Sequence, residues 1–179
     1  MQNLPFICSN SYRKHFMKPF FLLVLLFWGT GVYAQQLAVP DLLTIVNASV
    51  KTIDTTLKKK GYRLMKKEVD SSSAFYQYST FDVDDEKNLP NIRTLTFMDV
   101  TVRNLSSRLV TYRTYNKEEY QEIASYLLSH NYHSTGYFDF KESKHTLYSN
   151  GEETIRVKVI DTQQKTKKKI VAYELELGK

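Results

Sequence analysis

Histidines are the residues of this chain best suited to metal or general-base chemistry. Three follow the N-terminal segment: His130, His133 and His145. A metal site needs neutral imidazoles that converge with carboxylates at a recognisable spacing, as in His-Glu-x-x-His, and the chain lacks such a motif. His130 stands where a helix is expected to end, and a cation at that place is favoured by the helix dipole. We therefore predict no metal site and no histidine general base.

A short acidic run follows Phe81. Its oxygen-bearing side chains are Asp82, Asp84, Asp85, Glu86 and Asn88, four of which alternate like the first ligands of a calcium loop. Lys87 takes the place of the sharp-turn glycine and Arg93 that of the bidentate glutamate, so the calcium pattern fails. Because inserted loops often carry function, we interpret the loop from Phe81 to Asn91 as a solvated segment of a binding surface.

Tyrosine is the most suggestive residue type for binding. After residue 34 there are eleven tyrosines against five phenylalanines, and tyrosine combines apolar area with a polar group at surfaces that bind. Tyrosines that recur at corresponding places in two halves of the chain are expected in the core. Tyr76, Tyr115 and Tyr137 lack such a counterpart, so we predict them at a binding surface.

The motifs that would indicate an enzyme are missing. There is no Gly-x-Ser-x-Gly elbow, no phosphate-binding glycine loop and no dinucleotide fingerprint. The single cysteine, Cys8, precedes the expected mature chain, which excludes thiol chemistry and disulfides there. We predict no catalytic residue and no cofactor. A small hydrolase that uses scattered residues, namely Asp82, Asp139, His133 and His145, stays an alternative.

The first 34 residues have the features of a secretory signal peptide. Arg13, Lys14 and Lys18 precede an apolar run from Phe20 to Trp28, and small residues and Val32-Tyr33-Ala34 follow it. The run is shorter than the roughly 20 residues needed to span a bilayer, so we expect no stable membrane anchor. Met1 and Met17 are both candidate starts. Either start predicts a mature chain from Gln35, exported to the periplasm or the exterior.

Charge gives little support for a nucleic-acid partner. The net charge of the whole chain is +6, and without residues 1–34 it falls to +3. Basic clusters at 58–67 and 165–169 are interpreted as solvated surface. We therefore predict no nucleic-acid binding.

Two amphipathic helices are expected in the mature chain. Apolar residues fall on one face from Pro40 to Lys60, which predicts a single helix that ends at Gly61. A second helix begins at Asn116, whose side chain is expected to cap the first turn while Glu119 bonds back to it, and ends near Asn131.

An internal repeat follows from a constant offset of 70 residues. Leu57, Gly61, Tyr62, Tyr78 and Ser79 match Leu127, Asn131, Tyr132, Tyr148 and Ser149. Towards the end the offset shrinks to 61 and aligns Tyr112 with Tyr173. The expected strands lie near 62–69, 74–80, 92–103, 108–115, 134–140, 144–149, 154–161 and 169–177. The Asn150-Gly151 turn is the clearest hairpin signal.

These elements predict an α+β fold of two tandem helix-plus-four-stranded antiparallel repeats, residues 35–116 and 117–179, packed as one compact body. One curved sheet and two small sheets are both compatible with the pattern. The leading hypothesis is an exported, non-enzymatic protein-interaction module of the bacterial envelope or exterior. It would bind through its sheet and the loop from Phe81 to Asn91. A carrier of a small apolar or anionic ligand is the alternative beside the hydrolase, and the oligomeric state is left open.

Overall fold

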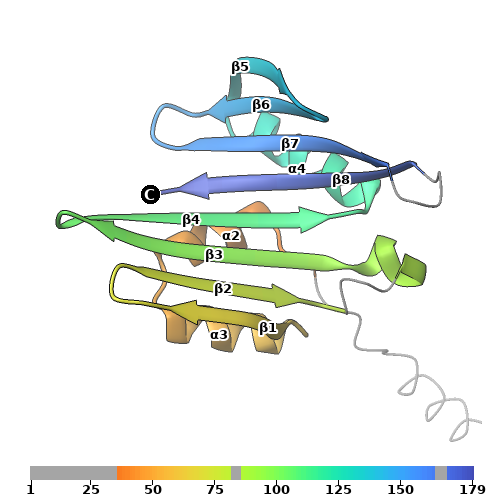
Figure 1. Cartoon of the computed structure of the whole chain (residues 1–179). Coiled ribbons are helices and arrows are strands. Elements are labelled where there is room, and N and C mark those ends of the chain that lie inside the picture. Colours follow the sequence, from red (N-terminus) through yellow and green to blue (C-terminus); the bar gives the residue numbers. More distant parts are fainter. Residues whose placement is uncertain (1–35, 82–85, 164–168) are drawn as a thin grey trace, which may run out of the picture. The chain divides into compact units, whose positions relative to one another are not determined.

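Eight strands and three helices make up the part of the chain that the computed structural model describes, residues 36–81, 86–163 and 169–179 (Figure 1). The helices are α2 (Val39–Asn47), α3 (Val50–Lys59) and α4 (Lys117–Ser129). The strands are β1 (Arg63–Val69), β2 (Ser73–Ser79), β3 (Arg93–Val102), β4 (Leu105–Thr114), β5 (His133–Phe140), β6 (Ser143–Ser149), β7 (Thr154–Gln163) and β8 (Lys169–Gly178). A 3₁₀ helix (Glu86–Asn91) precedes β3.

All eight strands belong to one antiparallel sheet, in the order β1-β2-β3-β4-β8-β7-β6-β5 (Figure 1). The fold is α+β, as predicted, and the strands form one sheet rather than two. β4 and β8 meet at its centre, where six residue pairs run from Leu109 opposite Gly178 to Thr114 opposite Tyr173. β1 and β5 are therefore the two edges of the sheet.

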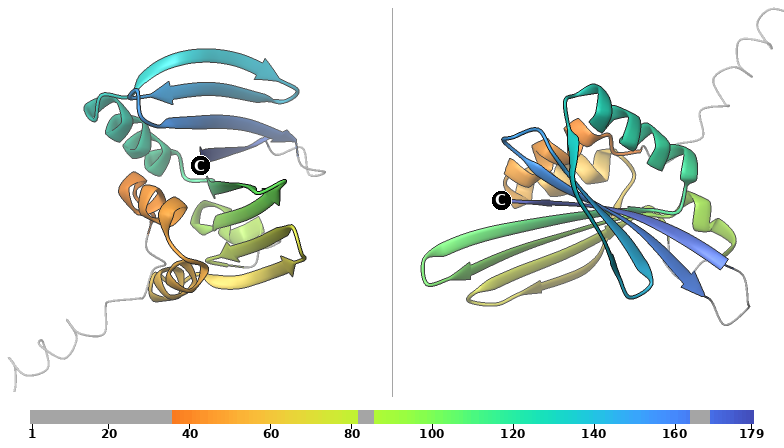
Figure 2. Two further views of the ribbon diagram at one scale, coloured as in Figure 1. Left: turned by 90° about the vertical axis from the view of Figure 1, so that its left-hand side faces the viewer. Right: turned by 90° about the horizontal axis from the view of Figure 1, so that it is seen from above.

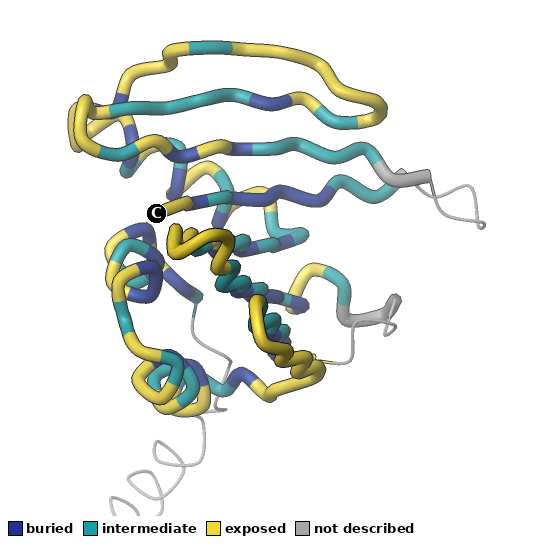
Figure 3. The backbone as a smooth tube through the Cα atoms, turned by 60° about the vertical axis from the view of Figure 1, so that its left-hand side comes forward, coloured by how far each residue is buried: buried dark blue, intermediate teal, exposed yellow. Residues whose placement is uncertain are grey.

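The helices pack against one face of the sheet (Figure 2). Side chains that alternate along the central strands point towards them and form the core, for example Leu95, Phe97, Tyr112 and Leu175. Figure 3 shows burial concentrated in the central strands and exposure along the edges. None of the described helices has the length and apolar character that a membrane crossing requires.

The single helix predicted from Pro40 to Lys60 is wrong, because the structure has two helices with a break at Ala48 and Ser49. Ala48 is extended, with φ −84° and ψ 159°. The Ser49 hydroxyl accepts a hydrogen bond from the backbone N–H of Thr52 at 3.2 Å and begins α3. A local capping residue thus interrupts an apolar pattern that is continuous across both helices.

The other predicted helix ends are largely confirmed. Asn116 caps α4 by accepting from the backbone N–H of Glu119 at 3.0 Å. Gly61 and Asn131 have positive φ values of 84° and 62°, the left-handed stops that were expected. The predicted return hydrogen bond from the Glu119 side chain to Asn116 is wrong, because that carboxylate instead accepts from Tyr112 and Thr114 of the sheet.

The pairing register corrects one detail of the sequence alignment. Tyr112 in β4 lies opposite Leu95 in β3, whereas Tyr173 in β8 lies opposite Val159 in β7. On its other side, Leu95 lies opposite Tyr78 of β2, and Ile155 of β7 lies opposite Tyr148 of β6 in the same way. Ile155 is therefore the counterpart of Leu95. The residue opposite Ile155 is Leu177. By pairing position, Leu177 and not Tyr173 therefore corresponds to Tyr112, because β7, its connection to β8 and β8 are together five residues longer over this span than β3, its turn and β4.

Candidate functional site

The described helices cover only one face of the sheet, and we name the other face the open face (Figure 2). Because side chains alternate along a strand, the neighbours of the core residues point to this open face. Arg113, for example, follows the buried Tyr112 in β4, and Glu174 precedes the buried Leu175 in β8. The open face is therefore a broad surface on a rigid antiparallel scaffold.

A chain of ion pairs crosses the centre of the open face. We name it the charged ladder, and its members are Arg113, Glu174, Lys158, Glu176 and Arg156. The Nε atom of Arg113 lies 2.6 Å from Glu174, and Lys158 lies 3.5 Å from the same carboxylate. Lys158 also contacts Glu176, which accepts from Arg156 at 3.1 Å. Three of these contacts join residues directly opposite one another in register.

The charges of the ladder are fixed by their neighbours. Glu174 is buried, yet two cations neutralise it. Burial lowers the pKa of Arg113, but the Glu174 carboxylate and the Tyr115 hydroxyl together raise it by more, so the net direction is upward. The paired cations and carboxylates of the ladder present a defined charge pattern to a partner.

Two apolar areas flank the ladder. At the β3–β4 turn, Val102 and Leu105 are 58% and 77% exposed, and Leu109 on the same face is also exposed. We name these three residues the hairpin patch. At the opposite side of the sheet, Phe138 and Phe140 of β5 are exposed on the same face. Exposed apolar area beside polar groups is typical of surfaces that bind other proteins.

The phenylalanines of β5 enclose His145 of β6. The imidazole stacks on Phe138 with a centroid distance of 4.7 Å and meets the edge of Phe140 at 6.4 Å. Its Nε2 atom lies 2.7 Å from the Ser143 hydroxyl, and its Nδ1 atom is buried without a partner among the described residues. His145 therefore packs as an aromatic side chain beneath an exposed aromatic corner.

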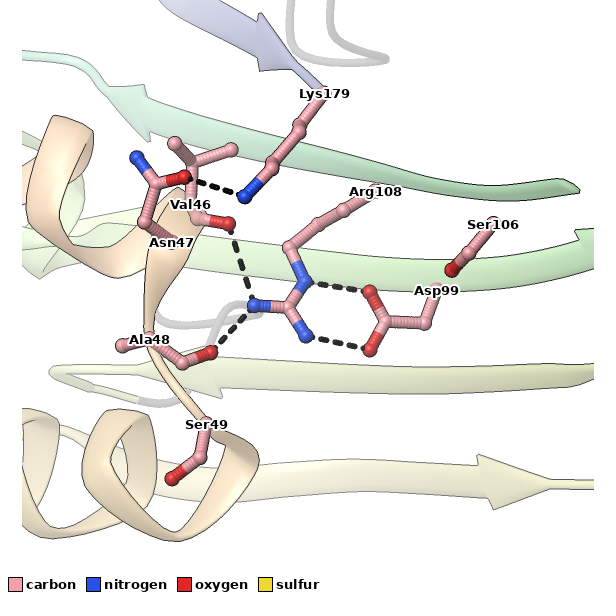
Figure 4. A pocket seen from close by; sticks show the side chains of 8 residues that line it. All are labelled: Val46, Asn47, Ala48, Ser49, Asp99, Ser106, Arg108 and Lys179. Carbon is pink, nitrogen blue, oxygen red and sulfur yellow. Dashed lines mark hydrogen bonds and ion pairs between the residues drawn. The ribbon is translucent and has the colours of Figure 1, made fainter.

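A pocket of about 440 Å³ lies on the other face of the sheet, where the chain breaks between α2 and α3 (Figure 4). Its walls are Val46, Asn47, Ala48, Ser49, Asp99, Ser106, Arg108 and Lys179. Arg108 occupies the centre and makes a two-pronged pair with Asp99, at 2.5 Å and 2.7 Å. The same guanidinium donates to the carbonyl oxygens of Val46 and Ala48 at 3.2 Å and 2.5 Å.

The charged groups that line this pocket are therefore bonded mainly to other groups of its wall. The end of α2 leaves carbonyl oxygens without helical donors. The Arg108 guanidinium, from β4, donates hydrogen bonds to two of them. The Asp99 carboxylate raises the pKa of Arg108 through its hydrogen bond, and burial opposes that shift. Lys179 is also paired, since its Nζ donates to the Asn47 side chain at 2.9 Å. Sequence reasoning missed Arg108 and Asp99, because their role depends on a helix break that it did not predict.

A second buried polar cluster centres on Glu119 of α4. Its carboxylate accepts from Arg93 at 2.8 Å and from Thr114 at 3.0 Å, and the Tyr112 hydroxyl donates to its other oxygen. Burial raises the pKa of Tyr112, and the Glu119 charge raises it further. These contacts hold the first turn of α4 to β3 and β4, a structural role.

The predicted surface residues fall in different places. Tyr137 is exposed, at 61%, and its hydroxyl donates to Asp139 at 2.9 Å. Tyr115 is half-buried at the end of β4. The expectation for Tyr76 is wrong, because it is buried and stacks on Phe97 at 5.0 Å. Tyr76 has the same parity along β2 as Tyr78 and faces the same core.

The acidic loop was the other predicted contributor. Asp82, Asp84 and Asp85 lie outside the described residues, and for Glu86 only the backbone, at the start of the 3₁₀ helix, is described. Phe81, just before them, is exposed. The tyrosines expected in the core are buried at positions 62, 78, 112, 132 and 173 and half-buried at 148.

Of the residues considered for a hydrolase, Asp82 lies outside the described residues, and Asp139 and His145 do not converge. Asp139 lies opposite Lys144 and the adjacent Phe138 lies opposite His145, so Asp139 and His145 point to different faces of the sheet. In the described ranges no three residues among His, Asp, Glu and Cys are grouped as a metal ion would need. Comparisons of the chain with protein-family models, curated proteins and solved structures find no match.

Proposed function

We propose that this protein is an interaction module that binds another protein through the open face of its sheet. The observation that carries the proposal is the composition of that face. The charged ladder occupies its centre, and exposed apolar side chains of the hairpin patch and of β5 lie at its two sides. A surface with fixed charges and apolar contact area offers both specificity and affinity to a protein partner.

The chemistry of the face favours a protein over a nucleic acid. Glu174 and Glu176 lie between the three cations of the ladder and occupy their hydrogen-bonding groups. A phosphate backbone needs unpaired arginine and lysine side chains, and acidic neighbours repel it. A protein surface with its own mixed charges can match this alternating pattern.

The loop from Phe81 to Asn91 is proposed as a secondary contributor. Phe81 is exposed at its start. Deletion of Asp82 to Asn88 is expected to weaken partner binding without abolishing it, because the open face supplies most of the contact area.

We infer that the two halves of the chain arose as repeats of one unit. Three correspondences support this inference, the first two at the 70-residue offset. The edge hairpins both shift register, between Leu64 and Lys66 and between Ser134 and Gly136. The turns after α3 and α4 close with the same backbone hydrogen bond: the N–H of Tyr62 donates to the carbonyl of Leu57, and the N–H of Tyr132 donates to that of Leu127. Each four-stranded half then continues to the centre of the sheet.

Export to the bacterial envelope or exterior is proposed on the sequence of residues 1–34. A basic start, a short apolar run and a small-residue end are the features that support it. The partner would then be an envelope or extracellular protein.

Site-specific photo-crosslinking in the protein's own host tests the interaction. A photoreactive residue at Ser107 lies on the open face beside the hairpin patch, and one at Thr55 lies on the exposed side of α3 as the matched control. We expect a discrete protein adduct from position 107 only, and we expect Leu109→Glu to remove it. Equal adducts from both positions, or none from position 107, would reject the open face as the binding surface.

A further inference from the structure

The two edges of the sheet differ sharply in charge. Every residue of β1 is exposed, and so is every residue of β5 except the half-buried Gly136. β1 presents Arg63, Lys66, Lys67 and Glu68, and charged side chains on an edge strand prevent it from pairing with another sheet. β5 instead has one carboxylate, Asp139, among exposed aromatic side chains. Only β1 therefore has the usual protection of a free edge.

This contrast holds position by position. Because both edge hairpins shift register at the same place, their residues can be matched directly. Lys66, Lys67 and Glu68 of β1 correspond to Gly136, Tyr137 and Phe138 of β5. Three consecutive residues that would protect the edge are thus replaced by glycine and two aromatic residues.

The backbone geometry says which residues of β5 are ready to pair. In an antiparallel strand, successive residues direct their N–H and C=O groups to alternate sides. Phe140 lies opposite Ser143 across a two-residue turn, so Phe140 and Phe138 direct these groups to β6. Tyr137 and Asp139 therefore direct theirs outward, away from the sheet.

We propose that β5 pairs antiparallel with β5 of a second copy of this chain, about a two-fold axis at Phe138. Tyr137 then lies opposite the partner's Asp139, and the reverse, so that the outward backbone groups bond to each other. Phe138 lies opposite the partner's Phe138, and Phe140 lies opposite the partner's Gly136. The proposal does not depend on the function proposed for the open face.

The side chains are complementary in this register. No charge lies opposite a like charge, and the Tyr137 hydroxyl, which already donates to Asp139 of its own strand, lies beside the partner's Asp139. A phenylalanine ring over a glycine of the neighbouring strand is a known stabilising pair, since the ring covers the exposed backbone. A slip of the partner by two residues would place Asp139 opposite the partner's Asp139, which is repulsive.

The size of the contact predicts a weak dimer. One strand pair buries less than the roughly 1,600 Å² of a standard stable interface, so dissociation in the micromolar range or above is expected. Because the axis is perpendicular to the sheet, the open faces of both copies point to the same side. The dimer therefore presents a continuous sheet with two copies of the charged ladder.

Cysteine crosslinking tests the axis directly. In a non-bonded antiparallel pair the Cα atoms are about 4.5 Å apart, within the range that a disulfide spans. The full chain with Cys8→Ser and Phe138→Cys is expected to form a covalent dimer on mild oxidation. Glu68→Cys, the matching position of β1, is expected to stay monomeric. Equal crosslinking of both variants, or of neither, overturns the proposal.

Sedimentation equilibrium up to about 1 mM tests the reversible dimer. Asp139→Pro removes an outward N–H that β6 does not use, and its expected effect is to raise the dissociation constant about tenfold or more. Val69→Pro is the matched control on β1, and it should leave the constant unchanged. Phe138→Lys, which retains every backbone group, should also prevent dimerisation and guards against misfolding by proline. A monomer at all concentrations, or equal effects of Asp139→Pro and Val69→Pro, contradicts the proposal.

Discussion

At the scale of single residues, this chain pairs tyrosine hydroxyls with carboxylates that are buried, as Glu119 is, or half-buried, as Asp54 and Glu153 are. Tyr78 donates to Asp54 at 3.3 Å, Tyr132 donates to Glu153 at 2.6 Å, and Tyr112 donates to Glu119. Each hydroxyl satisfies a carboxylate only while it holds its proton. Loss of that proton would place two negative charges together in the core or at its margin, so the folded state must resist it.

A fall in stability at alkaline pH follows from this arrangement. Burial and the Asp54 charge raise the pKa of Tyr78 to about 12, and burial raises the pKa values of Tyr62, Tyr112 and Tyr132 as well. The unfolded chain releases these protons near pH 10, the ordinary value, while the folded chain retains them. The stabilisation is therefore complete below about pH 10, and it is lost progressively as the pH rises from there through the raised folded-state pKa values.

Urea unfolding measured from pH 9 to pH 12 checks this expectation, with a midpoint that falls only in the upper part of the range. Tyr78→Phe, which cannot ionise, should flatten the fall. An unfolding midpoint that is constant across the range would contradict the assignment.

At the scale of elements, sequence periodicity was sufficient to predict the strands, because each is marked by its own local pattern. Each of the eight strands was predicted within three residues at its ends, because alternation and turn residues such as Asn150-Gly151 mark them locally. The break between α2 and α3 was missed, because the apolar stripe continues through it and only the cap of Ser49 signals it. The open face and its ladder were also beyond sequence reasoning, since cross-strand partners depend on register between β4, β7 and β8.

The break should depend on Arg108. Arg108→Gln removes the two-pronged pair with Asp99 and the donors to the Val46 and Ala48 carbonyls. We expect the free energy of unfolding to fall by about 2 kcal/mol, since hydrogen bonds that involve charged groups are among the stronger ones.

A double-mutant cycle with Asp99→Asn, measured by urea unfolding, separates the ion pair from the carbonyl bonds. If the two carbonyl bonds matter, Arg108→Gln remains destabilising in the Asp99→Asn background. A neutral effect there would assign the whole contribution to the ion pair.

At the scale of the whole molecule, the two four-stranded halves are joined by more than the β4–β8 pairing. The carboxylate of Glu119 on α4 is bonded to Arg93 of β3 and to Thr114 of β4. Tyr120 of the same helix stacks on Tyr173 of β8 with centroids 4.4 Å apart. The helix of the second half thus makes polar contacts to the first half and an aromatic contact to its own. We expect these joints to make unfolding a single cooperative event.

Native-state hydrogen exchange distinguishes this from separate unfolding of the halves. The free energy of the opening that permits exchange should be the same for amides of β3 and of β7. Glu119→Gln should lower both values by about 3 kcal/mol, because it leaves the mostly buried Arg93 without its counter-charge. Glu118→Gln, an exposed neighbour in the same turn, is the matched control and should change neither. If Glu119→Gln lowered protection in β3 alone while β7 kept its value, the halves would be independent folding units. The central pairing of β4 with β8 would then be a docking contact between them.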